Sequence, residues 1–197
     1  MNGSRVSQPL LRHCLAFAIP ALLLVLSACA PGRHMIAIDT RPSLTTKSDT
    51  AMLVIVRTTI AYGGYGINNY LDGKLIGQTQ GKCYFMTEVR PGTHYLMSRA
   101  DNIDTARLRF EAGRVYFLQQ GIYPGWNAAA RFSPMTPDEA KMEIQEASYL
   151  VYDAQKPGSD LSEKDYDKAK DDFEKENRED PTLHKDILDY RGYKPGK

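Results

Sequence analysis

Tyr70-Leu71-Asp72-Gly73-Lys74-Leu75-Ile76 is the stretch that decides the fold class. It places Asp72-Gly73 between apolar pairs, and this dipeptide predicts a tight β-hairpin because a type I′ turn requires positive φ at both central residues. The chain on either side continues in short segments with strand patterns. The hairpin therefore predicts a mainly β protein.

Five further strands are expected around this hairpin. Met52–Val56 is an uninterrupted, β-branched apolar run, as expected of a strand buried on both faces. Ala106–Glu111 alternates, so that Ala106, Leu108 and Phe110 face a core. The other expected strands are Cys83–Val89, Thr93–Arg99 and Val115–Leu118. Six or seven short strands separated by turns predict an antiparallel β-sandwich or a partly open barrel, and we prefer the sandwich.

A helix is predicted after the last strand. Thr136-Pro137-Asp138-Glu139 has the residues of a capping box, with proline at the first helical position. One helix face then carries Ala140, Ile144, Ala147 and Val151, with Leu150 beside them. We expect this face to pack on the sandwich, so that residues 51–155 form one domain.

The remaining residues, 156–197, are interpreted as a charged tail, partly helical or disordered. Nearly every other residue between Asp160 and Asp180 is charged, with both signs mixed. Such a segment buries little surface, so we expect a solvated, frayed helix. Leu183–Lys197 is expected to be extended or disordered.

The first 28 residues have the pattern of a secretory signal peptide. Arg5 and Arg12 precede an apolar run from Leu15 to Leu26, and no acidic residue comes before it. A run of this length is shorter than the roughly 20 residues that a transmembrane helix needs. Cleavage is therefore favoured over a permanent membrane span.

Leu26-Ser27-Ala28-Cys29 resembles the lipobox of bacterial lipoproteins. The resemblance implies cleavage between Ala28 and Cys29 and attachment of diacylglycerol to the Cys29 thiol; the alternative is an ordinary signal peptide that a plain signal peptidase removes. Ala30 stands where an aspartate typically retains such proteins in the inner membrane, which implies the outer membrane, facing the periplasm. Residues 29–50, rich in Pro, Gly, Ser, Thr and Asp, are expected to form a lipidated tether that holds the domain off the membrane.

Composition narrows the function classes. The net charge is +1 and hydrophobic residues make up 42% of the chain, so the sequence predicts a core but gives no reason to expect nucleic acid. Of the three cysteines, Cys14 is expected to be removed with the signal and Cys29 to be acylated. Cys83 then has no disulfide partner and is expected to be a buried core thiol.

No motif identifies catalytic residues, a metal site or a cofactor. His94 is expected to be a half-exposed strand residue, and Asp101-Asn102-Ile103-Asp104 a plain turn instead of a calcium loop. The loop aromatics Tyr62, Tyr65, Tyr123 and Trp126 form a possible binding patch if the loops after the first and last strands lie at the same end of the sandwich. The alternative is that these rings close the edge of the core.

The segment from Ala51 to Gly121 resembles a family of small bacterial lipoproteins of unknown function, and more distantly the PEGA-type surface modules. The matching motifs are the Met52–Val56 strand, the Leu71–Gly77 hairpin, the Arg90–His94 turn and Glu111–Tyr116. These motifs consist of residues that form strands and turns. The resemblance therefore implies a fold and no catalytic residue.

The sequence therefore predicts a membrane-anchored envelope lipoprotein that acts as a non-enzymatic binding or structural module. Its expected partners are membrane lipid, through the acylated N-terminus, and an envelope protein or glycan. The alternative is an envelope hydrolase or lyase whose site is assembled from dispersed residues. A deep pocket with converging ionisable groups would favour the enzyme.

Overall fold

The computed structural model describes residues 32–59, 64–123 and 129–195, which contain ten strands and three helices. The chain divides into two units, Met1–Ala30 and Pro31–Lys197, and the described residues all belong to the second. The strands are β1 (Met35–Ile38), β2 (Ala51–Arg57), β3 (Ile67–Leu71), β4 (Lys74–Thr79), β5 (Cys83–Val89), β6 (Gly92–Arg99), β7 (Ile103–Phe110), β8 (Val115–Tyr123), β9 (Ala129–Pro134) and β10 (Ser148–Tyr152). The helices are α2 (Pro137–Glu146), α3 (Glu163–Glu179) and α4 (Lys185–Asp189).

The strands form two sheets, which confirms the predicted mainly β fold. The six-stranded sheet has the order β1-β10-β5-β2-β8-β9, and the four-stranded sheet has the order β4-β3-β6-β7. Two pairings differ from the expected antiparallel pattern, because β2 runs parallel to β8 and β10 runs parallel to β5. The first parallel pair arises where the chain returns beside β2 after building the four-stranded sheet.

Three apolar clusters hold the layers together. The largest fills the space between the two sheets and includes Leu53, Ile55 and Leu108. A second lies between the six-stranded sheet and α2, and a third between the four-stranded sheet and α3. The central strand β2 contributes to both faces of its sheet, as its continuous apolar run predicted.

The local predictions around the hairpin and in the core are confirmed. Asp72 and Gly73 have φ of 49° and 79°, as a type I′ turn requires. The Asp72 carboxylate also accepts a hydrogen bond from the Tyr95 amide at 2.9 Å, which ties the turn to β6. Cys83 is 1% exposed, and burial raises the pKa of its thiol to about 11.

Helix α2 begins as predicted and ends earlier. Its capping box is complete, since the Glu139 amide donates to the Thr136 hydroxyl at 3.3 Å and the Thr136 amide donates to the Glu139 carboxylate at 2.8 Å. The helix stops at Glu146, so placing Leu150 and Val151 on its face was wrong. Both residues belong to β10, where a run of aromatic and branched side chains enters the sheet beside β5.

The segment expected as a flexible tether contains β1. Met35 is 4% exposed and belongs to the core between the sheets. β1 pairs with β10 in antiparallel register from Met35↔Tyr152 to Ile38↔Tyr149. Because the sequence predicts helix where β10 lies, it offers no partner for β1.

The residues expected as a solvated tail pack on the sandwich. Helix α3 is capped by Ser162 and buries Ala169 and Phe173, which are four residues apart on one face. Tyr190 is 9% exposed, and its hydroxyl accepts from the Phe117 amide at 3.0 Å. Tyr193 forms an isolated antiparallel bridge with Val115. A few well-placed apolar side chains are therefore enough to dock this highly charged segment.

Candidate functional site

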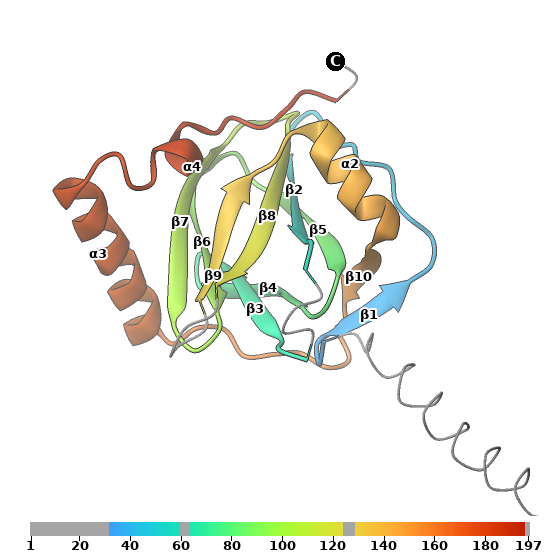
Figure 1. Cartoon of the computed structure of the whole chain (residues 1–197), viewed down its shortest axis with the longest axis horizontal. Helices are drawn as coiled ribbons and strands as arrows, with labels where there is room; N and C mark the ends of the chain where they lie inside the picture. The colour runs from blue at the N-terminus through green and yellow to red at the C-terminus, as the bar shows by residue number, and fades with distance from the viewer. Residues whose placement is uncertain (1–31, 60–63, 124–128, 196–197) are drawn as a thin grey trace, which may run out of the picture. The chain divides into compact units, whose positions relative to one another are not determined.

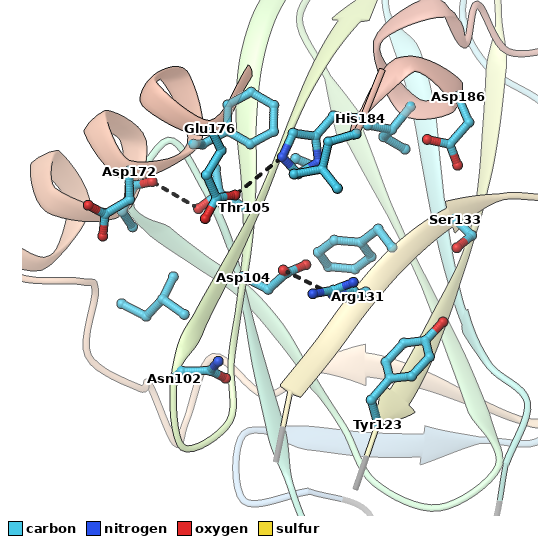
Figure 2. Close-up of a pocket in the computed structure, with 17 residues that line it drawn as sticks. Asn102, Asp104, Thr105, Tyr123, Arg131, Ser133, Asp172, Glu176, His184 and Asp186 are labelled. Carbon is cyan, nitrogen blue, oxygen red and sulfur yellow. Dashed lines mark hydrogen bonds and ion pairs between the residues drawn. The ribbon is translucent and has the colours of Figure 1, made fainter. Parts of the chain in front are cut away.

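One hollow of the described domain lies between the sandwich and the C-terminal helices. It has a volume of about 450 Å³, and we call it the β7–β9 cleft because residues of β7 and β9 line it together with α3 and α4 (Figure 2). Six acidic or basic side chains line it: Asp104, Arg131, Asp172, Glu176, His184 and Asp186. Four carboxylates thus face one guanidinium and one imidazole.

Strand periodicity places Asp104 in the cleft. Ala106, Leu108 and Phe110 point into the core from β7, as predicted, and Asp104 is on the same face two residues before Ala106. The core ends at this point, so the carboxyl group lies at the boundary between apolar interior and cleft. The expected turn at residues 101–104 is only partly correct, because β7 already begins at Ile103.

The environment of Asp104 favours its neutral form. Burial is the main cause, and with the negative charge of Glu176 it outweighs Arg131, so the pKa of Asp104 rises to about 6. The Arg131 guanidinium lies 3.8 Å from the Asp104 carboxylate and is itself 64% exposed, so it is a weak partner. Asp104 therefore exchanges its proton close to neutral pH.

The opposite wall comes from α3 and the segment before α4. The His184 ring packs against Phe173 in a tilted arrangement with ring centroids 4.5 Å apart, and its Nε2 lies 3.4 Å from the Glu176 carboxylate. Figure 2 shows Glu176 and His184 on the helical side of the cleft, across from Asp104 and Arg131. Phe173 is 3% exposed, so this wall is anchored in the packing of α3.

Tyr123 lies at the lower end of the cleft in Figure 2. It is the last residue of β8 and is 51% exposed, and the Arg131 guanidinium lies 5.8 Å from its ring centroid. An exposed aromatic ring beside carboxylates suits recognition of a sugar face or of a cationic group.

The predicted aromatic patch is described only in part. Tyr65 is 38% exposed, and its hydroxyl donates a hydrogen bond to Asp101 in the turn between β6 and β7. Tyr123 lines the cleft with Asn102 of the same turn, so both tyrosines lie near it. The parallel pairing of β2 with β8 is the arrangement that the patch requires. Tyr62 and Trp126 lie outside the described residues, as do Ala28 and Cys29, and these assignments stay predictions.

A row of buried polar side chains supports the end of the sandwich that carries Tyr65. Arg57 donates to the carbonyls of Tyr65 at 2.7 Å and Thr79 at 3.1 Å, and burial lowers the pKa of this guanidinium. The Thr79 hydroxyl bonds to Gln120, whose amide donates to Asn69 at 2.7 Å. These bonds tie strands of both sheets together and fix the Tyr65 backbone.

Sequence reasoning found Tyr123 but missed most of the cleft. Its other ionisable residues come from β7, β9, α3, α4 and the residue before α4, and no fixed spacing connects them. The available signals were the position of Asp104 in line with Ala106 and Leu108, and the four-residue spacing of Ala169 and Phe173. His94, by contrast, lies as expected on a strand, half-buried and bonded to Asp72.

Comparison of the chain with protein-family models, curated proteins and solved structures found no match. The resemblance to small lipoproteins and PEGA-type modules therefore stays a prediction. Among the described residues, no helix is long and apolar enough to cross a membrane.

Proposed function

We propose that this chain is a cell-envelope lipoprotein, cleaved between Ala28 and Cys29 and held at a membrane by lipid on the Cys29 thiol. The observation that carries the proposal is Leu26-Ser27-Ala28-Cys29 at the end of an apolar run of signal-peptide length. Ala30 favours the outer membrane, facing the periplasm.

Substitution of the lipobox cysteine tests this proposal. Cys29→Ala should abolish acylation and the associated cleavage, because the acylated thiol marks the substrate of the lipoprotein peptidase. Mass spectrometry of the N-terminal peptide and membrane fractionation measure both. Cys14→Ala changes the other cysteine of the N-terminal segment and is the matched control, which should be processed normally. Normal mature protein from Cys29→Ala in the membrane fraction would contradict the proposal.

The domain is proposed to act as a non-enzymatic binding module, with the β7–β9 cleft as its ligand site. Four carboxylates against Arg131 and His184 leave an excess of negative charge, which favours a ligand that carries a cationic group. A volume of about 450 Å³ suits one extended side chain or a small saccharide. Envelope proteins with exposed lysine or arginine and glycans with free amino groups have this chemistry.

Matched sugars separate charge recognition from shape recognition. An oligomer of glucosamine should shift the amide NMR signals of β7, β9 and α4, whereas the equally long oligomer of N-acetylglucosamine, which lacks the charge, should not. Glu176→Gln should weaken binding by about 1 kcal/mol or more. Glu179→Gln, on the same helix but outside the cleft, should leave it unchanged. Equal effects of both sugars would show that charge is not the basis of recognition.

A second candidate, an envelope hydrolase or lyase, is favoured by one observation. Asp104 has a pKa of about 6 and therefore suits general acid or base catalysis near neutral pH, with Glu176 as a neighbouring carboxylate. Release of reducing ends from envelope glycan, lost in Asp104→Asn but retained in Asp186→Asn, would favour this enzyme. Binding without turnover would favour the module.

A further inference from the structure

Three apolar side chains are exposed together where β1 pairs with β10. Ile36, Ile38 and Val151 are 44%, 39% and 38% exposed. The antiparallel register places Ile36 opposite Val151, and Ile38 is two residues farther along β1. Side chains alternate along a strand, so all three point to the same side of the sheet. We call these three residues the β1 edge face.

The β1 edge face continues an apolar layer that is covered elsewhere. Tyr149 lies opposite Ile38 on the same side of the sheet and packs on Tyr84, with ring centroids 5.1 Å apart. Tyr84 belongs to the cluster that α2 covers. The layer thus extends beyond α2 to the outermost strand, where nothing in the described chain covers it.

The attachment point of the chain restricts what covers this face. Gly32 is fixed to the domain, since its carbonyl accepts from the Met35 amide at 3.0 Å and the next amide, of Arg33, donates to Gln78 at 2.7 Å. Cys29 is three residues earlier, and an extended chain spans at most about 3.6 Å per residue. An acylated Cys29 therefore lies within about 11 Å of Gly32. Because the polar region of a leaflet is itself about 5–8 Å thick, the start of β1 is held at the bilayer surface.

Basic side chains lie at both ends of the β1 edge face. His34 bonds to the Lys156 carbonyl at 2.8 Å, which keeps the Lys156 backbone beside His34 at the start of β1, and the preceding residue, Arg33, is exposed. Arg41 donates to the Gln145 carbonyl at 2.8 Å, just before β10 begins. The acids nearby are Asp39, which is exposed, Asp153, which pairs with Lys156 at 3.4 Å, and Glu146, which follows Gln145 and pairs with Lys82 at 2.7 Å. Apolar side chains flanked by cations suit the interfacial region of a membrane that contains anionic lipid.

We propose that the β1 edge face docks on the phospholipid surface to which Cys29 is anchored, so that the domain lies against the membrane instead of standing off on a flexible tether. The inference rests on the proposed lipoprotein function. β1 and β9 are the opposite edges of the six-stranded sheet, as Figure 1 shows. Docking through β1 therefore leaves the β7–β9 cleft open to the periplasm, where a ligand reaches it.

Nitroxide labels test the contact on the lipidated protein reconstituted in vesicles of phosphatidylethanolamine and phosphatidylglycerol. Val151→Cys places a label in the face, far in sequence from the lipobox, and Ile38→Cys serves if that variant fails to fold. Leu183→Cys, an exposed apolar position between α3 and α4, is the matched control. Acylation occupies Cys29, and Cys83 is 1% exposed, so neither competes for the label.

The Val151 label should lose collisions with an aqueous nickel chelate and gain collisions with oxygen on the vesicles, while the Leu183 label should show neither change. A Val151 label as open to the chelate as the Leu183 label would overturn the inference. Spin–spin broadening that grows with protein density would overturn it in favour of a second copy pairing along β1. Mass spectrometry of the N-terminal peptide reports separately on the anchor. An unacylated Cys29 would contradict both the lipid anchor and the docking of the β1 edge face. An acylated Cys29 with an exposed label would contradict only the docking.

Discussion

Asp104→Asn should stabilise the domain at neutral and alkaline pH. Folding raises the pKa of this carboxyl group from 3.8 to about 6, chiefly through burial. Between these values the folded state binds a proton that the unfolded state has released, so the free energy of unfolding falls as pH rises. A tenfold change in proton affinity is worth about 1.4 kcal/mol, which gives a penalty of at most about 3 kcal/mol above the folded pKa. The side chain keeps 26% exposure, so we expect about 2 kcal/mol.

Urea denaturation of the mature chain, followed by circular dichroism at about pH 8 and about pH 4, measures this effect. The amide cannot ionise, so the variant should be more stable than the wild type at pH 8 and nearly equal to it at pH 4. Asp186→Asn, an exposed carboxylate of the same cleft, is the matched control and should change stability by less than about 0.5 kcal/mol at either pH. A loss of stability at pH 8 in Asp104→Asn would show that Arg131 stabilises the ionised form and would refute the argument.

Three other substitutions test the packing. Phe173→Ala should lower the free energy of unfolding by about 3–5 kcal/mol, because it removes the side chain that packs α3 on the sandwich. Hydrogen exchange of the α3 amides should accelerate. Unchanged stability would show that the helix is solvated. Tyr190→Phe should lower the free energy of unfolding, measured by urea denaturation, by about 1–3 kcal/mol, since the Phe117 amide loses the hydroxyl that accepts its hydrogen bond. Unchanged stability would mean that water replaces the hydroxyl. Thr136→Ala should lower the free energy of unfolding by about 1 kcal/mol through loss of the α2 cap, and an unchanged midpoint would indicate that the cap contributes nothing.

Features that depend on a few adjacent residues were predictable. The Asp72-Gly73 turn, the Thr136 cap and the inward face of β7 each follow from a local steric or hydrogen-bonding requirement. Pairing between distant strands has no such local signature. The sequence around Leu150 fits helical spacing as well as a strand, and only the neighbouring edges of β5 and β1 decide for the strand.

The C-terminal segment shows why composition misled. Its charge content correctly indicates that α3 exposes most of its surface, but docking needs only one apolar stripe. Ala169 and Phe173 supply that stripe, and the Arg107–Glu174 ion pair at 2.7 Å stands beside it. A net count of charged residues averages over the helix faces and hides this asymmetry.

The same segment also gives the candidate site its character. Asp104 and Arg131 come from the sandwich, whereas Asp172, Glu176 and Asp186 come from residues after the predicted domain boundary. Without these later residues the start of β7 would face open water. The two causes that raise the pKa of Asp104, burial and the negative charge of Glu176, would then be lost. The C-terminal segment therefore forms one wall of the cleft. Its apolar stripe packs that wall on the sandwich, and its carboxylates favour a cationic ligand.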